Sequence, residues 1–438
     1  MFDNRVKTKT DRVLGLLAQY ESPNVLWIDP AGGWPVVWER AKGSEVWDAE
    51  GRKYIDLTAA FGVAAAGHAN PRVVAAGRRQ MGRLLHAMGD VHPHALKAEL
   101  ARELSRITFE RWSDGRAAGK TIFCNSGFEA VEAALKTALL ATKKSHIIAF
   151  TGGYHGLGYG ALNATHREHF RGPFHPQLSQ FGRFVPFPTA AQHLPSVERQ
   201  IKHIMSVESI GAIIAEPIQA RGGINVPPRG FLQLLRKLCD RAGALLILDE
   251  IYTGFGRAGR WFACEHEAVA PDVLCLGKAL AGGFPISACV GRSDVLDNAW
   301  PSSSGEAIHT STFLGHPVGC AMALAQIHEL SRRRLPERSA ELGGWLLNEL
   351  RAQLDPLNLN AEIRGRGLMI GVEFRDAESQ PAATLVLNLV KRMLRRGFLL
   401  LPEGEAANVV SFTPPLTIAR AQLKAAVAAF KASLLEQQ

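Results

Sequence analysis

The sequence predicts an α/β fold: a large domain with a mostly parallel sheet, joined to a smaller α+β domain. Between residues 95 and 320, short apolar runs alternate with amphipathic helical stretches, which is the pattern of a parallel sheet covered by helices. Residues 35–58 contain three short strand patterns separated by turn residues, which predicts a small antiparallel sheet. From about residue 325 onward, helical patterns surround a strand pattern at residues 367–374, as in a small α+β unit.

These patterns divide the chain into three expected segments. Residues 1–60 form an N-terminal segment whose small antiparallel sheet is part of the small domain. Residues 61–324 form the large domain, and residues 325–438 form the C-terminal small α+β domain.

Charge and cysteine content exclude several classes of protein. The net charge is +9, but the densest basic runs, at residues 332–334 and 391–396, fit solvated helix faces and accompany no nucleic-acid motif. No apolar run reaches about 18 residues, the length of a transmembrane helix, and the polar N-terminus does not resemble a secretory signal. The six cysteines form no CxxC pair, which favours free thiols in a reducing cytoplasm and no metal site.

Five buried strand patterns each stop at polar residues. Ligands of open parallel sheets bind at the carboxyl ends of the strands, so these polar residues are the candidates for chemistry. The strand patterns, with the residues that end them, are KTIFCNS, HIIAF, IGAIIAE, ALLILDE and DVLCLGK.

The first strand end leads into a helix at residues 129–144. Ser126 and Glu129 have the spacing of a capping box, and Gly127 permits close backbone approach. A helix N-terminus with free N–H groups, a serine and a glycine can bind a phosphate. A plain capped helix is the alternative interpretation of the same motif.

The next strand ends supply an aromatic residue and two carboxylates. Tyr154 and His155 follow the second strand and could cover a flat ring, although His155 alone is equally typical of a loop. Glu216 could order water or pair with a base, or form a strand-end salt bridge. Asp249 follows five apolar residues and needs a cationic partner once it is buried, such as a protonated pyridine nitrogen.

Lys278 ends the fifth strand and is followed by ALAGGFP. Burial lowers the pKa of a lysine, and an unprotonated amine among small residues suits Schiff-base chemistry. A phosphate cup, an aromatic cover, a buried aspartate and a lysine together indicate pyridoxal 5'-phosphate (PLP) as cofactor.

The motifs resemble those of the class III (ω-) aminotransferases, which have the fold type I architecture of PLP-dependent enzymes. The resemblance is carried by LLILDEIYTGFGRAG, followed by APDVLCLGKALAGGFP, which is similar to the signature of that family. The segments NSGFEAVEAALK, GGYHG, AEPIQ and HTSTFLGHPVGCAMALA occur in the family's order and spacing. The resemblance covers about residues 35–415 and implies that 61–324 is the PLP-binding domain.

The resemblance implies a role for each matching residue at the cofactor ring. Lys278 would form the Schiff base and shuttle the proton, and Asp249 would pair with the ring nitrogen. Ile251 would pack beneath the ring and Tyr154 over its other face, with His155 nearby.

Further matches imply phosphate ligands and a dimer. Ser126, Gly127 and Phe128 would bind the phosphate, although Phe128 offers no hydroxyl where the family often has one. Thr312 would reach the phosphate of the neighbouring subunit, which implies a homodimer with shared active sites. Glu216 would face the substrate side or support a neighbouring group.

Four departures from the family pattern bear on the substrate. Leu157 and Ser411 stand where many members carry arginines for the two carboxylates of glutamate, and Arg221 stands where many carry a glutamate. Tyr252 replaces a glutamine that usually bonds the ring hydroxyl, although its own hydroxyl could bond that oxygen. We therefore expect Arg221 to bind one substrate carboxylate, with a surface arginine as the alternative.

The expected function is that of an aminotransferase working by a ping-pong mechanism. It would move an amino group from a primary amine or amino acid to a keto acid or aldehyde, and we expect Phe61 to contact the substrate. An aminomutase, a racemase or a decarboxylase on the same fold is the alternative. A nicotinamide-dependent dehydrogenase is disfavoured, because the glycine-rich stretches 156–160 and 365–367 do not fit the GxGxxG fingerprint.

Overall fold

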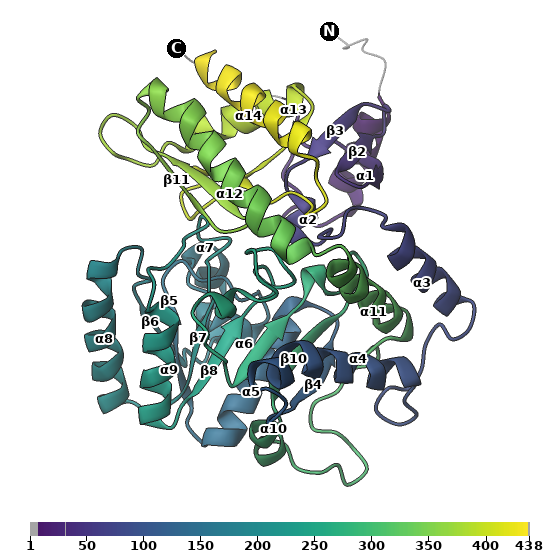
Figure 1. Ribbon diagram of the computed structural model, residues 1–438, viewed down its shortest axis with the longest axis vertical. Helices are drawn as coiled ribbons and strands as arrows, with labels where there is room; N and C mark the ends of the chain where they lie inside the picture. The colour runs from purple at the N-terminus through teal and green to yellow at the C-terminus, as the bar shows by residue number, and fades with distance from the viewer. Residues whose placement is uncertain (1–7, 31, 437–438) are drawn as a thin grey trace.

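The computed structural model describes residues 8–30 and 32–436. The first seven residues of the expected N-terminal segment, residue 31, and the last two of the C-terminal domain lie outside this description. The chain forms two lobes, a large one around a central sheet and a smaller one that contains both the first and the last helix (Figure 1).

The large lobe contains a seven-stranded sheet in which six strands are parallel. Its strands, in spatial order, are β4 (Gly119–Cys124), β10 (Ser287–Arg292), β9 (Val273–Leu276), β8 (Leu245–Asp249), β7 (Ile210–Ala215), β5 (His146–Phe150) and β6 (Gly182–Val185). β10 runs antiparallel to both of its neighbours, whereas the pairs from β9 to β6 are all parallel. The predicted mostly parallel sheet is confirmed.

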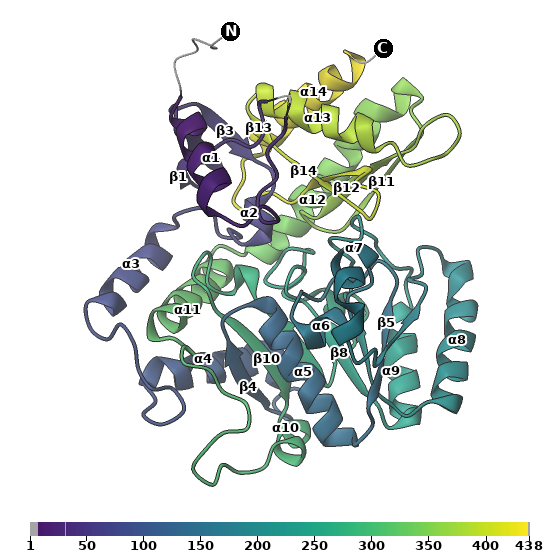
Figure 2. The same cartoon turned by 180° about the vertical axis from the view of Figure 1, so that it is seen from behind.

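Helices cover both faces of this sheet because successive strand residues point to opposite sides. On β8, Leu246 and Leu248 join one buried cluster while Ile247 joins the other. One face packs against α4 (Ala95–Ser105), α8 (Leu194–Val207) and α9 (Phe231–Ala242). The other packs against α5 (Gly127–Thr142), α6 (Tyr159–Leu162) and α10 (Ser293–Ala299), on the side seen in Figure 2. Both faces are apolar, as the continuous apolar strand patterns predict.

The small lobe is built on a second sheet with helices against it. Its strands, in spatial order, are β11 (Ala361–Gly365), β12 (Ile370–Phe374), β15 (Val409–Phe412) and β14 (Leu401–Glu403), all antiparallel. Its helices are α12 (Leu335–Leu354), α13 (Ala383–Arg395) and α14 (Arg420–Leu435).

The N-terminal segment pairs with the C-terminal part of the chain. After α1 (Lys9–Tyr20), the strands β1 (Trp38–Lys42), β2 (Glu45–Asp48) and β3 (Lys53–Asp56) form the antiparallel sheet. β13 (Phe398–Leu399) then adds to β3 in parallel. This pairing supports the proposal that the N-terminal sheet belongs to the small domain.

The expected boundary between residues 324 and 325 falls inside a continuous helix, α11 (Pro317–Arg332). The boundary expected there stays a prediction. α11 packs against α3 (Pro71–Met81) and α4 beside the large domain. The short helices α2 (Ala59–Gly62) and α7 (Glu168–Arg171) complete the set of α-helices in the described residues. Every helix in this part of the chain is too short or too polar to cross a bilayer.

Candidate active site

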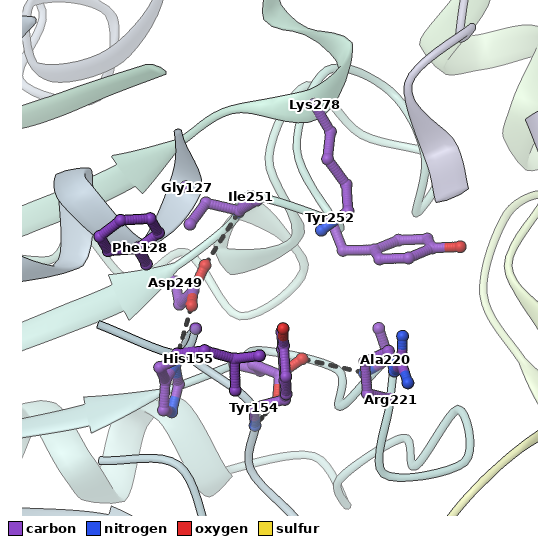
Figure 3. A pocket seen from close by; sticks show the side chains of 13 residues that line it. Gly127, Phe128, Tyr154, His155, Ala220, Arg221, Asp249, Ile251, Tyr252 and Lys278 are labelled. Atoms are coloured by element: carbon purple, nitrogen blue, oxygen red, sulfur yellow. Dashed lines mark hydrogen bonds and ion pairs between the residues drawn. The ribbon is translucent and has the colours of Figure 1, made fainter. Parts of the chain in front are cut away.

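A pocket of about 410 Å³ opens at the carboxyl ends of the parallel strands (Figure 3). It brings together most of the residues that the sequence predicts. The lining consists of Gly127, Phe128, Tyr154, His155, Gly156, Leu157, Glu216, Ala220, Arg221, Asp249, Ile251, Tyr252 and Lys278.

Asp249 ends β8 and is held by two donors. Its Oδ2 lies 2.8 Å from His155 Nδ1, and its Oδ1 accepts a hydrogen bond of 3.1 Å from the Ile251 N–H. Burial alone would lower the pKa of His155, but the hydrogen bond to Asp249 and the charges of Asp249 and Glu216 together outweigh burial and raise this pKa. His155 is therefore a support for the aspartate, a role that its position in the sequence does not reveal.

Lys278 follows β9 and extends into the same pocket (Figure 3). Its φ of 36° lies in the left-handed region, where non-glycine residues are uncommon and often functional. Its Nζ lies 4.8 Å from the centroid of the Tyr252 ring. Burial lowers the pKa of Lys278, although Asp249 and Glu216 oppose the shift. A neutral amine at this point is a nucleophile and a base.

Glu216 directly follows β7 and joins two loops of the site. It accepts hydrogen bonds of 3.0 Å from the backbone N–H groups of Tyr154 and Ala220. Burial raises the pKa of Glu216 to about 7. The side chain therefore fixes the Tyr154 loop and can be neutral while it does so.

Tyr154 forms an aromatic wall of the pocket. Its ring makes an edge contact with Phe170, with the centroids 5.5 Å apart. The Arg221 guanidinium carbon lies 5.4 Å from the Tyr154 centroid, and burial raises the pKa of the Tyr154 hydroxyl. A cation near the ring face is a favourable contact.

The capping box expected at Ser126 is formed only on its glutamate side. Glu129 accepts from the N–H groups of Asn125 (2.6 Å) and Ser126 (2.9 Å). The Ser126 Oγ is buried and has no hydrogen-bond partner in the described part of the chain. A Cβ atom at Gly127 would lie 3.0 Å from Ile251 Cδ1, so the glycine permits the tight approach of α5 to the pocket. An unpartnered hydroxyl at the N-terminus of α5 fits a phosphate group.

Glu403, on β14, is a neighbour of the site that the sequence interpretation missed. Its Oε2 lies 3.5 Å from Arg221 Nε, and the side chain is buried. Burial raises the pKa of Glu403, against the opposing effect of Arg221, Lys278 and Arg167. No motif marks Glu403, because it approaches Arg221 only through the packing of β14 beside the loop that carries Arg221.

Three predicted residues lie away from this lining. Ser126 sits behind it, at the start of α5. Thr312 is exposed in the loop that precedes α11. Phe61 is 49% exposed, has a φ of 61°, and lines a separate apolar cleft of about 240 Å³ beside β13.

At two positions marked by departures from the family pattern, Tyr252 and Ser411, the hydroxyl group contacts an atom outside the pocket lining. The Tyr252 hydroxyl lies 3.1 Å from Thr413 Oγ1 in the small domain, so the expectation that it bonds a ring oxygen gains no support. Burial raises the pKa of Tyr252 to about 12, which keeps that hydroxyl protonated. Ser411 is buried on β15, and its Oγ lies 3.5 Å from the Leu401 carbonyl oxygen.

The family model for aminotransferase class III matches residues 29–434, nearly the whole chain. The chain belongs to the class III aminotransferases. This class III aminotransferase uses PLP and moves an amino group between an amino donor and a keto acid. The resemblance stated from the sequence motifs is confirmed, as is the predicted cofactor.

Relatives with assigned activities match this chain over most of its length and of theirs. An acetylornithine aminotransferase from Methanosarcina mazei is 38% identical over 397 residues, covering 90% of this chain and 91% of the relative. A 5-aminovalerate aminotransferase from Pseudomonas aeruginosa is 37% identical over 405 residues, covering 90% and 92%.

Solved structures agree with the fold. The ornithine aminotransferase of Toxoplasma gondii superposes with a TM-score of 0.85 at 30% identity, covering 99% of this chain and 96% of that chain. An amine transaminase from an uncultivated Pseudomonas species, solved in its PLP-bound form, has a TM-score of 0.87 at 29% identity, covering 95% and 98%. The predicted fold type I architecture is confirmed.

Proposed function

We propose that this class III aminotransferase takes as donor an amine that carries a single carboxylate, at the far end of a short carbon chain from the amine. The observation that carries the proposal is the presence of Arg221 in the pocket that also contains Lys278. Acetylornithine and 5-aminovalerate, named for two relatives, both have a primary amine at one end of such a chain and a carboxylate at the other.

The charges of the pocket support one carboxylate rather than two. Among the described residues of the lining, Arg221 is the one guanidinium. Its Nε has no hydrogen-bond partner within the described chain and lies 3.5 Å from Glu403 Oε2, so a substrate carboxylate would compete with Glu403 for this guanidinium. Arg257 cannot supply a second site, because it is fully buried and donates to the carbonyl oxygens of Leu368 (2.9 Å) and Pro414 (2.5 Å).

The roles of the cofactor-site residues are part of this proposal. PLP, when bound, supplies an electron sink that stabilises negative charge on the substrate carbon. The residues present fit this group: Lys278 Nζ would attach it and then carry the proton, and Asp249, oriented by His155, would hold the charged ring nitrogen. Tyr154 and Ile251 would enclose its ring.

The phosphate of the cofactor would lie at the start of α5. The free Ser126 hydroxyl and the first N–H groups of α5, at Gly127 and Phe128, would bind it. Glu216 would hold the Tyr154 loop in place.

Donor preference should follow the single arginine. We expect kcat/KM for 5-aminovalerate to exceed that for glutamate, whose second carboxylate has no cation in the pocket, by at least about tenfold, the effect of one charge-assisted contact of about 1.4 kcal/mol. Arg221→Met should lower kcat/KM for 5-aminovalerate by a similar factor. The same variant should leave 1-aminopentane, which lacks the carboxylate, nearly unchanged. Steady-state rates with the three donors measure these ratios.

The control for Arg221 is Arg260→Met, because Arg260 is exposed and does not line the pocket. Its donor ratios should equal those of the wild type. If glutamate is the best donor and Arg221→Met leaves every ratio unchanged, the proposed carboxylate site is wrong.

We also propose a homodimer in which Thr312 completes the phosphate site of the partner. Apolar side chains are exposed along the segment 81–91 and on the loop that carries Thr312. They are Met81, Leu84, Leu85, Met88, Val91, Ile308 and Phe313. The two segments lie together, since the His86 and Phe313 rings are 5.4 Å apart. An exposed apolar surface of this kind is typical of an interface.

Heterodimers can test which subunit supplies the threonine. A Thr312→Ala, Lys278→Ala chain paired with a wild-type chain has one site with a lysine, and that site would receive alanine from its partner. We expect cofactor affinity at this site to fall by about tenfold or more, with weak activity at limiting PLP, because one charge-assisted hydrogen bond is lost. Differently tagged chains allow the heterodimer to be isolated and assayed.

The matched control pairs a Lys278→Ala chain with the wild type, so that the lysine-bearing site keeps its threonine. Within one chain, Ser311 Oγ lies 3.3 Å from Asn125 Nδ2, close to the start of α5. Delivery of Thr312 within its own chain is therefore the competing arrangement. Equal activity of the two heterodimers would refute delivery by the partner.

A cytoplasmic location remains part of the proposal. All six cysteines carry free, buried thiols, which suits a reducing compartment.

A further inference from the structure

Arg364 reaches from the small-domain sheet to the loop that carries Arg221. It lies on β11, does not line the pocket, and is largely buried. Its Nη2 donates to the Gly223 carbonyl oxygen (2.7 Å) and its Nε to the Ile224 carbonyl oxygen (3.1 Å). One planar guanidinium therefore donates hydrogen bonds to the carbonyl oxygens of two successive residues, Gly223 and Ile224, which follow Arg221 in the same loop.

The Arg364 guanidinium is itself held in place. Its Nη1 donates to Glu373 Oε2 (2.6 Å) on the neighbouring strand β12. The other Glu373 oxygen accepts from Arg375 Nη2 (2.7 Å) and Asn408 Nδ2 (3.3 Å). Burial would raise the pKa of Glu373, but the hydrogen bond to Arg364 and the charges of Arg364 and Arg375 together outweigh burial and lower this pKa, so the carboxylate stays ionised. The bond to Glu373 therefore fixes the orientation of the Arg364 guanidinium toward the loop.

The loop needs such support because its backbone is unusual. Ile224 has a φ of 53°, a region that β-branched residues rarely adopt. Such a conformation persists only where the surroundings determine it. The Gly404 N–H adds a bond of 3.2 Å to the Arg221 carbonyl oxygen from the small domain. The same loop is also bonded to the large lobe, because Gln219 Nε2 donates to the Thr151 carbonyl oxygen (2.7 Å).

We infer that Arg364 is the positioning residue that sets Arg221 for the substrate carboxylate. The inference rests on the proposed function, in which Arg221 binds that carboxylate. The Arg221 guanidinium lies 3.5 Å from Glu403 Oε2 and 5.4 Å from the Tyr154 ring centroid, and the position of its backbone decides how its charge faces the substrate between them. Arg364 holds that backbone through Gly223 and Ile224.

The test compares two donors that differ only in the carboxylate. In Arg364→Met we expect KM for 5-aminovalerate to rise about tenfold, with kcat at saturation within about twofold of the wild type. Both constants for 1-aminopentane should stay unchanged. The dissociation constant of pentanoate, an unreactive carboxylate, should rise by the same factor as KM, and calorimetry measures it without turnover.

Two further variants keep the test decisive. Arg364→Lys preserves the charge beside Glu373 but cannot donate to both carbonyl groups. It should raise KM for 5-aminovalerate less than Arg364→Met does. It replaces the methionine variant in the test if that variant does not fold. Arg375→Met is the matched control, because Arg375 shares Glu373 but has no hydrogen bond to the 219–225 loop in the described residues. It should match the wild type with both donors and with pentanoate.

Each other outcome overturns the inference. An equal loss for both donors would make Arg364 a general structural support, and no loss for either would make its contacts to the loop irrelevant. The parallel Arg221→Met measurement separates the two proposals. If Arg221→Met discriminates between the donors and Arg364→Met does not, the positioning role alone fails. If Arg221→Met does not discriminate, the carboxylate site itself fails.

Discussion

Lys278→Ala is expected to lower the rate of transamination by roughly 10³-fold or more, because one side chain supplies both the nucleophilic amine and the proton carrier. Burial lowers the pKa of Lys278, which increases the share of its neutral form relative to an exposed lysine. The variant should still bind PLP, but without a covalent bond. Borohydride reduction followed by peptide mass spectrometry should locate the cofactor on Lys278 in the wild type and on no peptide in the variant.

Lys120→Ala is the control, since Lys120 lies on β4, forms a surface ion pair with Asp297 and does not line the pocket. It should retain wild-type rates. Cofactor found on a different lysine after reduction of the wild type would overturn the assignment of Lys278.

Asp249→Asn should cost about 4 kcal/mol of activation free energy, or about 10³-fold in kcat. A carboxylate beside the ring nitrogen favours its protonated form, which is the stronger electron sink, whereas an amide offers no negative charge. The loss should appear in kcat with every donor. The absorbance spectrum of the bound cofactor, titrated against pH, reports the protonation of the ring independently of turnover.

His155→Leu provides a graded comparison. It removes the 2.8 Å hydrogen bond to Asp249 but keeps the carboxylate, so the loss should be about tenfold, the effect of one charge-assisted bond. A near-wild-type kcat in Asp249→Asn would rule out the ring-nitrogen role.

Much of the pocket could be predicted because it depends on short-range patterns. An apolar strand that ends in a polar residue places that residue at the carboxyl edge of the sheet, and Glu216, Asp249 and Lys278 meet there for that reason. The chemistry of each side chain then follows from burial. The antiparallel direction of β10 was not predicted, since its apolar run resembles those of its parallel neighbours.

The remaining features depend on which surfaces meet, and a local pattern contains no such information. Arg364 lies more than 100 residues from the carbonyl groups that it binds, and Glu403 approaches Arg221 from a different domain. The Ser126 capping box fits the sequence spacing, yet the Ser126 hydroxyl is left unpartnered because Glu129 alone caps the helix end. Phe61 and Thr312 lie outside the pocket lining of the single chain, and their roles in the site stay predictions.

The pairing of β3 with β13 has a consequence for synthesis on the ribosome. Ile55 and Asp56 pair with Phe398 and Leu399, more than 300 residues later. At about 5 to 20 residues per second, the early strands wait roughly 20 to 70 s for their partner to be translated.

During that interval, the apolar side chains destined for the shared cluster have no native cover. Val46 and Tyr54 come from the early strands, and Leu394 and Leu399 from the late part of the chain. The small lobe is therefore expected to close last on the nascent chain, and the first sixty residues are the segment that a chaperone would need to shield.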